Sequence, residues 1–339
     1  MKSGKGKMKR PNVAVLGDGG WGTTLAILLS RKGYNVSLWS AFSDYGAFLR
    51  KNRVNTKFLP GIKIPADIEI TSDLKAACLN KQLIVFAIPS KYIRGVLKKF
   101  KSLQIDNDAI YLSVIKGIEL NSLKRMSEVI LEELGRIKLA VLSGPTIAYE
   151  VAIGKPSCAV ISSKDKKIRR YLQNIFMTEK FRIYTNEDVV GVELGGSLKN
   201  VIAIACGVSD GLGFGTNTKA AILSRGLAEI SRLGVNMGAK KETFSGVSGL
   251  GDLVTTCIST RSRNRFVGEQ VGKGKSLGSI RSHMQMVAEG ITTAKSAYQL
   301  SRRNKVSMPI TKEIYSVLYK NKSPFKAVKD LMTRSKKEE

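Results

Sequence analysis

The fold of this 339-residue chain is decided by residues 13–22, VAVLGDGGWG, and by the helical stretch Thr23–Lys32 that follows. An apolar strand runs directly into Gly17, Gly19 and Gly22. In that order, the first glycine permits a tight turn, the second lets the backbone approach a pyrophosphate, and the third lets the helix pack closely on the strand. The free N–H groups that open the helix favour a phosphate there. The stretch therefore predicts a dinucleotide-binding loop, the alternative being a glycine-rich turn in an unrelated α/β fold.

The next strand, Val36–Trp39, does not settle which dinucleotide is bound. A carboxylate about 20 residues beyond the loop would read the ribose 2′-hydroxyl of NAD, whereas an arginine would accommodate the 2′-phosphate of NADP. The strand ends in Leu38-Trp39-Ser40-Ala41, which contains neither. A 2′-phosphate would then depend on the more distant Arg50, Lys51 or Arg53. We therefore expect NADH to be used at least comparably to NADPH.

Short apolar runs alternate with amphipathic stretches from Pro11 to about Arg182. Runs of this kind fit strands buried on both faces of a parallel sheet. The predicted strands are Val13–Leu16, Val36–Trp39, Leu83–Ala87, Ile110–Val114, Leu139–Ser143 and Ala159–Ser162, with a helix at Ser122–Leu134.

After about Asp188 the alternation fades, and residues 189–233 and 284–304 read as long helices. Residues 262–268 predict a loop, followed by a weak helix at Val271–Ser282. The fold class is therefore α/β, a Rossmann-type doubly wound, mostly parallel sheet followed by an all-helical domain. The expected divisions are a basic tail (1–10), a dinucleotide-binding domain (11–188) and a helical substrate-binding domain (189–333).

Composition narrows the class of protein. The 56 basic and 27 acidic residues give a net charge of +29, but the lysines are spread along the chain and aromatics are sparse. This pattern favours a compositional bias over a specific nucleic-acid partner. Four scattered cysteines and a single histidine, His283, argue against a metal centre. No apolar run approaches the roughly 18 residues of a membrane span, so we expect a cytoplasmic protein.

Two lysines are candidates for acid–base chemistry. Lys199 lies in Gly195-Gly196-Ser197-Leu198-Lys199-Asn200, a helical run of otherwise small and apolar residues, and Lys116 ends the strand-like run Tyr111–Ile115. A lysine in an apolar setting has a lowered pKa and acts as an acid or base near neutrality. Surface solvation is the alternative for any one lysine, but the neighbours of Lys199 argue against it.

Two loops have the polarity that a phosphate-bearing substrate requires. Ser262-Arg263-Asn264 follows Gly249-Leu250-Gly251-Asp252-Leu253, and an arginine fork with neighbouring hydrogen-bond donors suits a phosphate. Gly144-Pro145-Thr146 follows the strand Leu139–Ser143 and lies at a strand end. Both loops are candidates for the substrate site.

With these motifs the chain resembles the NAD(P)-dependent glycerol-3-phosphate dehydrogenases of the bacterial type, from Val13 to about Leu331. The diagnostic segment runs from Gly196-Ser197-Leu198-Lys199-Asn200 through Ser209-Asp210-Gly211 to Gly215-Thr216-Asn217. The resemblance implies interconversion of glycerone phosphate and sn-glycerol 3-phosphate with NAD or NADP, a homodimer, and a product that feeds phospholipid synthesis.

The resemblance also implies residue roles, with Lys199 as proton donor and acceptor. Around the substrate it places Lys116, Gly144, Thr146, Lys199, Asp252, Ser262, Arg263 and Asn264. Near the cofactor it places Gly20, Trp21, Lys116, Ala148, Arg263, Val287 and Glu289, beside Gly17, Gly19 and Gly22. The sequence departs from the family at Gly20, often Ser or Ala, and at Ala41, where a basic residue is common.

Two other functions remain as alternatives. Another two-domain dehydrogenase, of the 6-phosphogluconate or β-hydroxyacid type, would share the architecture but not the Asp252 and Arg263-Asn264 blocks. A basic nucleic-acid-binding protein on a Rossmann-like scaffold would explain the charge but not an apolar-flanked Lys199.

Overall fold

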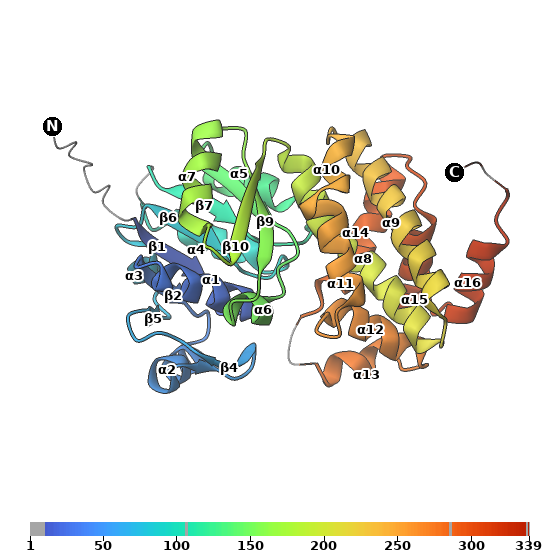
Figure 1. Ribbon diagram of the computed structural model, residues 1–339, viewed down its shortest axis with the longest axis horizontal. Coiled ribbons are helices and arrows are strands. Elements are labelled where there is room, and N and C mark those ends of the chain that lie inside the picture. Colours follow the sequence, from blue (N-terminus) through green and yellow to red (C-terminus); the bar gives the residue numbers. More distant parts are fainter. Residues whose placement is uncertain (1–10, 106–107, 285–286, 337, 339) are drawn as a thin grey trace.

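A computed structural model describes residues 11–336 and 338, except 106–107 and 285–286. The predicted basic tail, residues 1–10, lies outside the described part. The sheet forms one half of the molecule and helices form the other, with α16 at the end remote from the sheet (Figure 1).

The sheet has eight strands in the order β10-β9-β8-β7-β6-β1-β2-β5, parallel except for the antiparallel pair β8–β9. The strand order reverses beside β1, and ligands of doubly wound sheets bind beyond the carboxyl ends of the strands at such a point. The strands are β1 (Asn12–Leu16), β2 (Asn35–Trp39), β5 (Glu69–Thr71), β6 (Leu83–Phe86), β7 (Ile110–Ser113), β8 (Lys138–Ser143), β9 (Ser157–Ser162) and β10 (Phe181–Asn186).

All six predicted strands are confirmed, but four short or exposed ones were not predicted. β10 buries Phe181 and exposes Arg182 and Tyr184, so it lacks the continuous apolar run of a central strand. β5 has only three residues, and β3 (Val54–Asn55) and β4 (Leu59–Lys63) form a small separate ribbon. Strands at a sheet edge need only one buried face, and their pattern is correspondingly weak.

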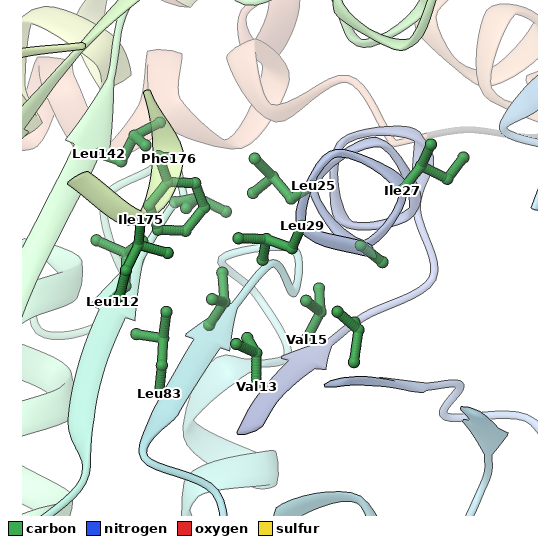
Figure 2. Packing of buried hydrophobic residues seen from close by; sticks show 14 of the residues in the cluster. Val13, Val15, Leu25, Ile27, Leu29, Leu83, Leu112, Leu142, Ile175 and Phe176 are labelled. Atoms are coloured by element: carbon green, nitrogen blue, oxygen red, sulfur yellow. The ribbon is translucent and has the colours of Figure 1, made fainter. Parts of the chain in front are cut away.

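Helices cover both faces of the sheet. Val13 and Val15 of β1 point to one face, beneath Leu25 and Leu29 of α1 (Figure 2). Ala14 and Leu16 belong to the cluster on the other face, and all four β1 side chains are fully buried. The helices of this half are α1 (Gly20–Arg31), α2 (Ser43–Asn52), α3 (Leu74–Cys78), α4 (Ile93–Lys101), α5 (Met126–Leu134), α6 (Ala148–Ala152) and α7 (Lys166–Phe176).

In the second half, all the secondary-structure elements among the described residues are helices. Residues 262–268, predicted as a loop, instead begin a helix capped by the Ser262 side chain, so that prediction was wrong. The arginines make the composition of this stretch resemble that of a loop. The helix nevertheless buries Val267 and Val271 on its inner side. The helices are α8 (Val189–Gly211), α9 (Thr216–Asn236), α10 (Lys241–Ser245), the π-helical η1 (Val247–Gly251), α11 (Asp252–Ile258), α12 (Arg263–Gly272), α13 (Leu277–Ser282), α14 (Glu289–Arg303), α15 (Pro309–Tyr319) and α16 (Pro324–Met332).

Helix α8 is the central element of this half. It is long and apolar enough to cross a membrane, but 89% of its most apolar window is buried inside the molecule, as in the core helix of a soluble protein. Glu193 joins it to the start of α5 by accepting hydrogen bonds from Ser127 N at 2.7 Å and Ser127 Oγ at 2.6 Å. These bonds fix the first turns of α8 against the sheet half.

Glycines let α12 lie directly against α8. A Cβ on Gly268 would collide with the carbonyl oxygen of Ile204, and a Cβ on Gly207 would collide with that of Arg265. Backbone atoms of both helices occupy the space that side chains would need. The contact therefore fixes the start of α12, where Arg263 and Asn264 lie, relative to α8.

Gly268→Ala is expected to lower the free energy of unfolding by about 3 kcal/mol, the upper end for an overpacked core. The matched control is Gly278→Ala in α13, where the nearest atom to a new Cβ lies 4.0 Å away. That substitution should leave stability unchanged or raise it by up to about 1 kcal/mol through helix propensity. Urea unfolding of both variants measures the difference, and equal stabilities would contradict the close packing.

Candidate active site

Two lysines share one buried carboxylate between the two halves of the chain. Asp252, 1% exposed at the start of α11, accepts a hydrogen bond from Lys116 Nζ at 2.8 Å through Oδ2. Its Oδ1 accepts one from Lys199 Nζ, from α8. Two ammonium groups facing one carboxylate leave a net positive charge, which suits an anionic substrate or a developing oxyanion.

Small residues let Lys199 reach this position. A Cβ on Gly195 would lie 2.7 Å from the carbonyl oxygen of Ser248 in η1, and one on Gly196 would collide with Ser143 Oγ at the end of β8. Both glycines lie one turn before Lys199, on the same side of α8. The side that carries the lysine therefore approaches both the sheet edge and the residues that lead into Asp252.

Burial makes the Lys199 ammonium titrate near neutrality. The side chain is 5% exposed, and the loss of hydration lowers its pKa to about 7, the positive charge of Lys116 adding to this decrease. The carboxylate of Asp252 opposes the decrease because it favours the charged form. Lys199 Nζ also donates a hydrogen bond to Thr256 Oγ1 at 2.7 Å. The buried, lowered-pKa lysine predicted from the sequence is thus present.

Lys116 is held by the loop that follows β8. Its Nζ donates to the carbonyl oxygen of Gly144 at 2.8 Å and to Thr146 Oγ1 at 3.2 Å. Gly144 has a φ of +145°, and a Cβ there would lie 2.8 Å from Ala159 Cα. The structure therefore brings Lys116, Gly144, Thr146, Lys199 and Asp252 together, as predicted.

Asn264 reaches the same cluster through a second residue. Its Nδ2 donates to Asn200 Oδ1 at 2.8 Å, and Asn200 Nδ2 donates to the carbonyl oxygen of Lys116 at 3.3 Å. Asn264 Oδ1 accepts from Gly290 N at 2.9 Å, next to Glu289. The Glu289 carboxylate in turn accepts from Ser90 N at 2.9 Å. The chain of bonds joins α8, α12 and α14 to the sheet edge.

Ser262, Arg263 and Val287 form no hydrogen bond with either lysine among the described residues. Ser262 Oγ caps α12 by accepting from Arg265 N at 3.2 Å, and Arg263 Nη1 donates to the carbonyl oxygen of Val287 at 2.8 Å. Arg263 is exposed to solvent and forms no salt bridge with a described residue. Its remaining N–H groups are free to face an anion.

The glycine loop at the end of β1 has room for a pyrophosphate. Gly17 has a φ of +116°, and a Cβ on Gly22 would collide with its carbonyl oxygen, so both glycines are required by the turn itself. By contrast, a Cβ on Gly19 would meet nothing within 4 Å, and no side chain caps the start of α1. A bare backbone beside uncapped N–H groups fits the phosphates of a dinucleotide.

Three more of the predicted cofactor residues, Gly20, Trp21 and Ala148, lie within or beside this loop. A Cβ on Gly20 would lie 2.6 Å from the carbonyl oxygen of Phe58 and 3.7 Å from Ala148 Cβ. Trp21 packs edge-on against Phe181, with ring centroids 6.3 Å apart. The indole N–H of Trp21 is buried without a hydrogen-bond partner in the described chain.

Sequence reasoning missed Thr256, Asn200 and Ser90 as members of the site. Thr256 lies four residues after Asp252, and its hydroxyl donates to the Asp252 carbonyl oxygen at 2.7 Å. That i,i+4 spacing on a helix was a usable signal. Ser90 is joined to Glu289 across 199 residues, and nothing local indicates such a pairing.

Comparisons with known proteins identify the family of this chain. The chain matches the family model of the NAD-dependent glycerol-3-phosphate dehydrogenase N-terminus over residues 12–169 and that of the C-terminus over residues 188–329. The glycerol-3-phosphate dehydrogenase (NAD(P)+) of Prosthecochloris aestuarii is 49% identical over 330 residues, 96% of this chain and 99% of the relative. That of Thermoanaerobacter sp. (strain X514) is 50% identical over 327 residues, 96% of this chain and 98% of the relative.

A solved structure of a related protein has the same overall fold as this chain. The crystal structure of glycerol-3-phosphate dehydrogenase from Coxiella burnetii superposes with a TM-score of 0.93 at 36% identity, covering 96% of this chain and 99% of that one. The resemblance drawn from the motifs is confirmed, in both halves of the chain. The chain therefore belongs to the family of NAD-dependent glycerol-3-phosphate dehydrogenases, oxidoreductases that use NAD or NADP.

Proposed function

We propose that this chain interconverts glycerone phosphate and sn-glycerol 3-phosphate, with Lys199 as the acid and base. The observation that carries the proposal is the buried Lys199 ammonium, held by Asp252 and Thr256 and titrating at a pKa of about 7. An acid whose pKa lies near the operating pH transfers protons efficiently in both directions. Family membership supplies the substrate class.

The chemistry divides between the cofactor and the protein. The bound reduced nicotinamide supplies a hydride to the carbonyl carbon of the substrate. Lys199 stabilises the negative charge that develops on the carbonyl oxygen and donates the proton to it. Asp252 holds the ammonium groups of Lys199 and Lys116 in place, and Lys116 adds a second positive charge. In the reverse direction, neutral Lys199 accepts the hydroxyl proton.

The two ligands occupy neighbouring regions in this proposal. The dinucleotide lies along Gly17, Gly19, Gly20, Trp21 and Gly22, and the substrate lies between the two lysines and the start of α12. The further cofactor residues are Lys116, Ala148, Arg263, Val287 and Glu289, and the further substrate residues are Gly144, Thr146, Ser262, Arg263 and Asn264.

Family membership supports the cellular setting that we propose. We propose a cytoplasmic homodimer whose product supplies phospholipid synthesis, with no specific nucleic-acid partner. A steady-state assay with glycerone phosphate and each reduced cofactor tests the reaction. Turnover of 6-phosphogluconate or a β-hydroxyacid in place of glycerone phosphate would transfer the chain to the alternative dehydrogenase class.

Arg263→Lys is expected to raise KM for glycerone phosphate about tenfold, equivalent to about 1.4 kcal/mol. Lysine keeps the charge but cannot present the planar fork that binds a phosphate through two N–H groups. The control is Arg261→Lys two residues earlier, where the guanidinium stacks over the Tyr149 ring at 4.0 Å. Steady-state kinetics of both variants give the comparison, and an unchanged KM in Arg263→Lys would remove this arginine from the phosphate site.

A further inference from the structure

Asp18, the second residue of the glycine loop, is a nearly buried carboxylate that the mechanism does not use. It is 9% exposed and forms no salt bridge with any lysine or arginine in the described part of the chain. Its Oδ2 accepts a hydrogen bond from Ser40 Oγ at 2.6 Å. Burial raises the pKa of this carboxyl above its ordinary value, so keeping it charged costs free energy. A carboxylate retained at such a cost indicates a functional position.

The hydrogen bond takes the carboxylate to the end of β2. Ser40 directly follows this strand, and Gly17 N donates to the carbonyl oxygen of Trp39 at 3.1 Å, which ties the loop to the strand end. The Asp18 carbonyl oxygen accepts from Asn55 Nδ2 at 2.7 Å and from Thr23 Oγ1 at 3.1 Å. Three residues, Ser40, Asn55 and Thr23, therefore fix both the backbone and the side chain of Asp18.

Ser40 occupies the position where dinucleotide-binding sheets carry their selective residue. Asp18 and Ser40 are 22 residues apart, which matches the spacing of about 20 at which an acid reads the ribose 2′-hydroxyl. The strand itself offers a hydroxyl at this point, with Ala41 after it. The glycine loop therefore supplies, through Asp18, the carboxylate that the end of β2 lacks.

Two cations near the end of α2, Arg50 and Arg53, are tied to backbone carbonyl oxygens. Arg50 Nη1 donates to the carbonyl oxygen of Ile70 at 3.2 Å, and Arg53 Nη1 donates to that of Ile68 at 2.7 Å. Lys57 is the cation whose charge acts on Asp18, and its Nζ lies over the Tyr45 ring, 4.6 Å from the centroid. No arginine fork faces Asp18 among the described residues to balance a phosphate of nearly two negative charges.

We propose that Asp18 makes this enzyme select the unphosphorylated dinucleotide, because its carboxylate accepts hydrogen bonds from the adenosine ribose and repels a 2′-phosphate. The inference rests on the placement of the dinucleotide at the glycine loop in the proposed function. Asp18 is then the residue that determines cofactor specificity. It supplies the carboxylate that is absent from the end of β2.

The test measures binding without turnover. Isothermal titration of the full chain uses two probes that lack nicotinamide, ADP-ribose and 2′-phospho-ADP-ribose. The wild-type protein is expected to bind ADP-ribose at least about tenfold more tightly, or 1.4 kcal/mol. Asp18→Asn should reduce that ratio at least about tenfold, mainly by tighter binding of the phosphorylated probe, because the repulsion is removed.

Two control variants separate a local effect from net charge. Asp44→Asn removes the same charge from the exposed start of α2 and should leave the ratio within about twofold, because exposed charges are screened. Ser40→Ala removes the hydrogen bond but keeps the carboxylate, so the preference for ADP-ribose should persist.

Four results would overturn the inference: tighter binding of the phosphorylated probe by the wild type, equal binding of the two probes by the wild type, an unchanged ratio in Asp18→Asn, or equal changes in Asp18→Asn and Asp44→Asn. The first result is measured on the wild-type protein alone, so the inference can be overturned even if Asp18→Asn does not fold. If the wild type binds neither probe, the placement of the dinucleotide fails as well. If it binds both equally, the placement stands and only the role of Asp18 fails.

Discussion

Lys199→Met is expected to reduce kcat at least about a hundredfold, because the loss of a general acid usually has an effect of this size. Methionine keeps most of the apolar stem of the side chain, so the buried position stays filled while the charge and the proton are removed. Asp252 keeps its second partner, Lys116, and the carboxylate is not left unpaired. Steady-state kinetics in both directions measure the loss.

Two further measurements show whether that loss is chemical. The affinity for ADP-ribose should stay within about twofold of wild type, because the glycine loop belongs to the other half of the chain. Lys312→Met, at an exposed position of α15, controls for the loss of one lysine. Near-wild-type turnover by Lys199→Met would make Lys199 a structural residue and Lys116 the next candidate.

Asp252→Asn is expected to lower kcat for glycerone phosphate reduction about a hundredfold at pH 7, through both the position and the pKa of Lys199. The Asp252 carboxylate raises the pKa of Lys199 against the effect of burial, so its removal lowers that pKa below about 7. Less of the lysine is then protonated at neutral pH, and the ammonium loses the partner that orients it.

The pH profile identifies this mechanism. Reduction needs protonated Lys199, so kcat/KM of the wild type should fall as the pH rises through about 7, whereas oxidation should show the opposite slope. In Asp252→Asn, the descending limb of the reduction profile should move toward acid by about one pH unit or more. A variant with lower activity but an unshifted limb would show that Asp252 acts on structure alone.

Local sequence rules predicted those parts of the site that depend on neighbours in the chain. The glycine spacing after β1 and the small residues before Lys199 both reflect close approaches of backbone, and a close approach restricts residue type directly. The pairing of Lys116 and Lys199 through Asp252 joins three distant segments, and no local pattern indicates which acid is shared. Here only the resemblance to a family pointed to Asp252.

The Asp18–Ser40 contact shows the same limit at shorter range. The end of β2 contains neither an acid nor an arginine in its own sequence. The acid comes from the adjoining loop, because parallel strands β1 and β2 end side by side. Sequence spacing locates a position in the fold but not the segment that supplies its side chain.

In the proposed mechanism, the π-helical turn η1 fixes how many residues may precede the shared carboxylate of Asp252. Gly251 N bonds to the carbonyl oxygen of Gly246, five residues earlier, and Asp252 follows at once as the first residue of α11. Each residue of a helix advances the side-chain direction by about 100°. One residue more or fewer between Val247 and Asp252 would therefore rotate the shared carboxylate away from both lysines. Surface loops accept insertions and deletions, but this segment has a single permitted length.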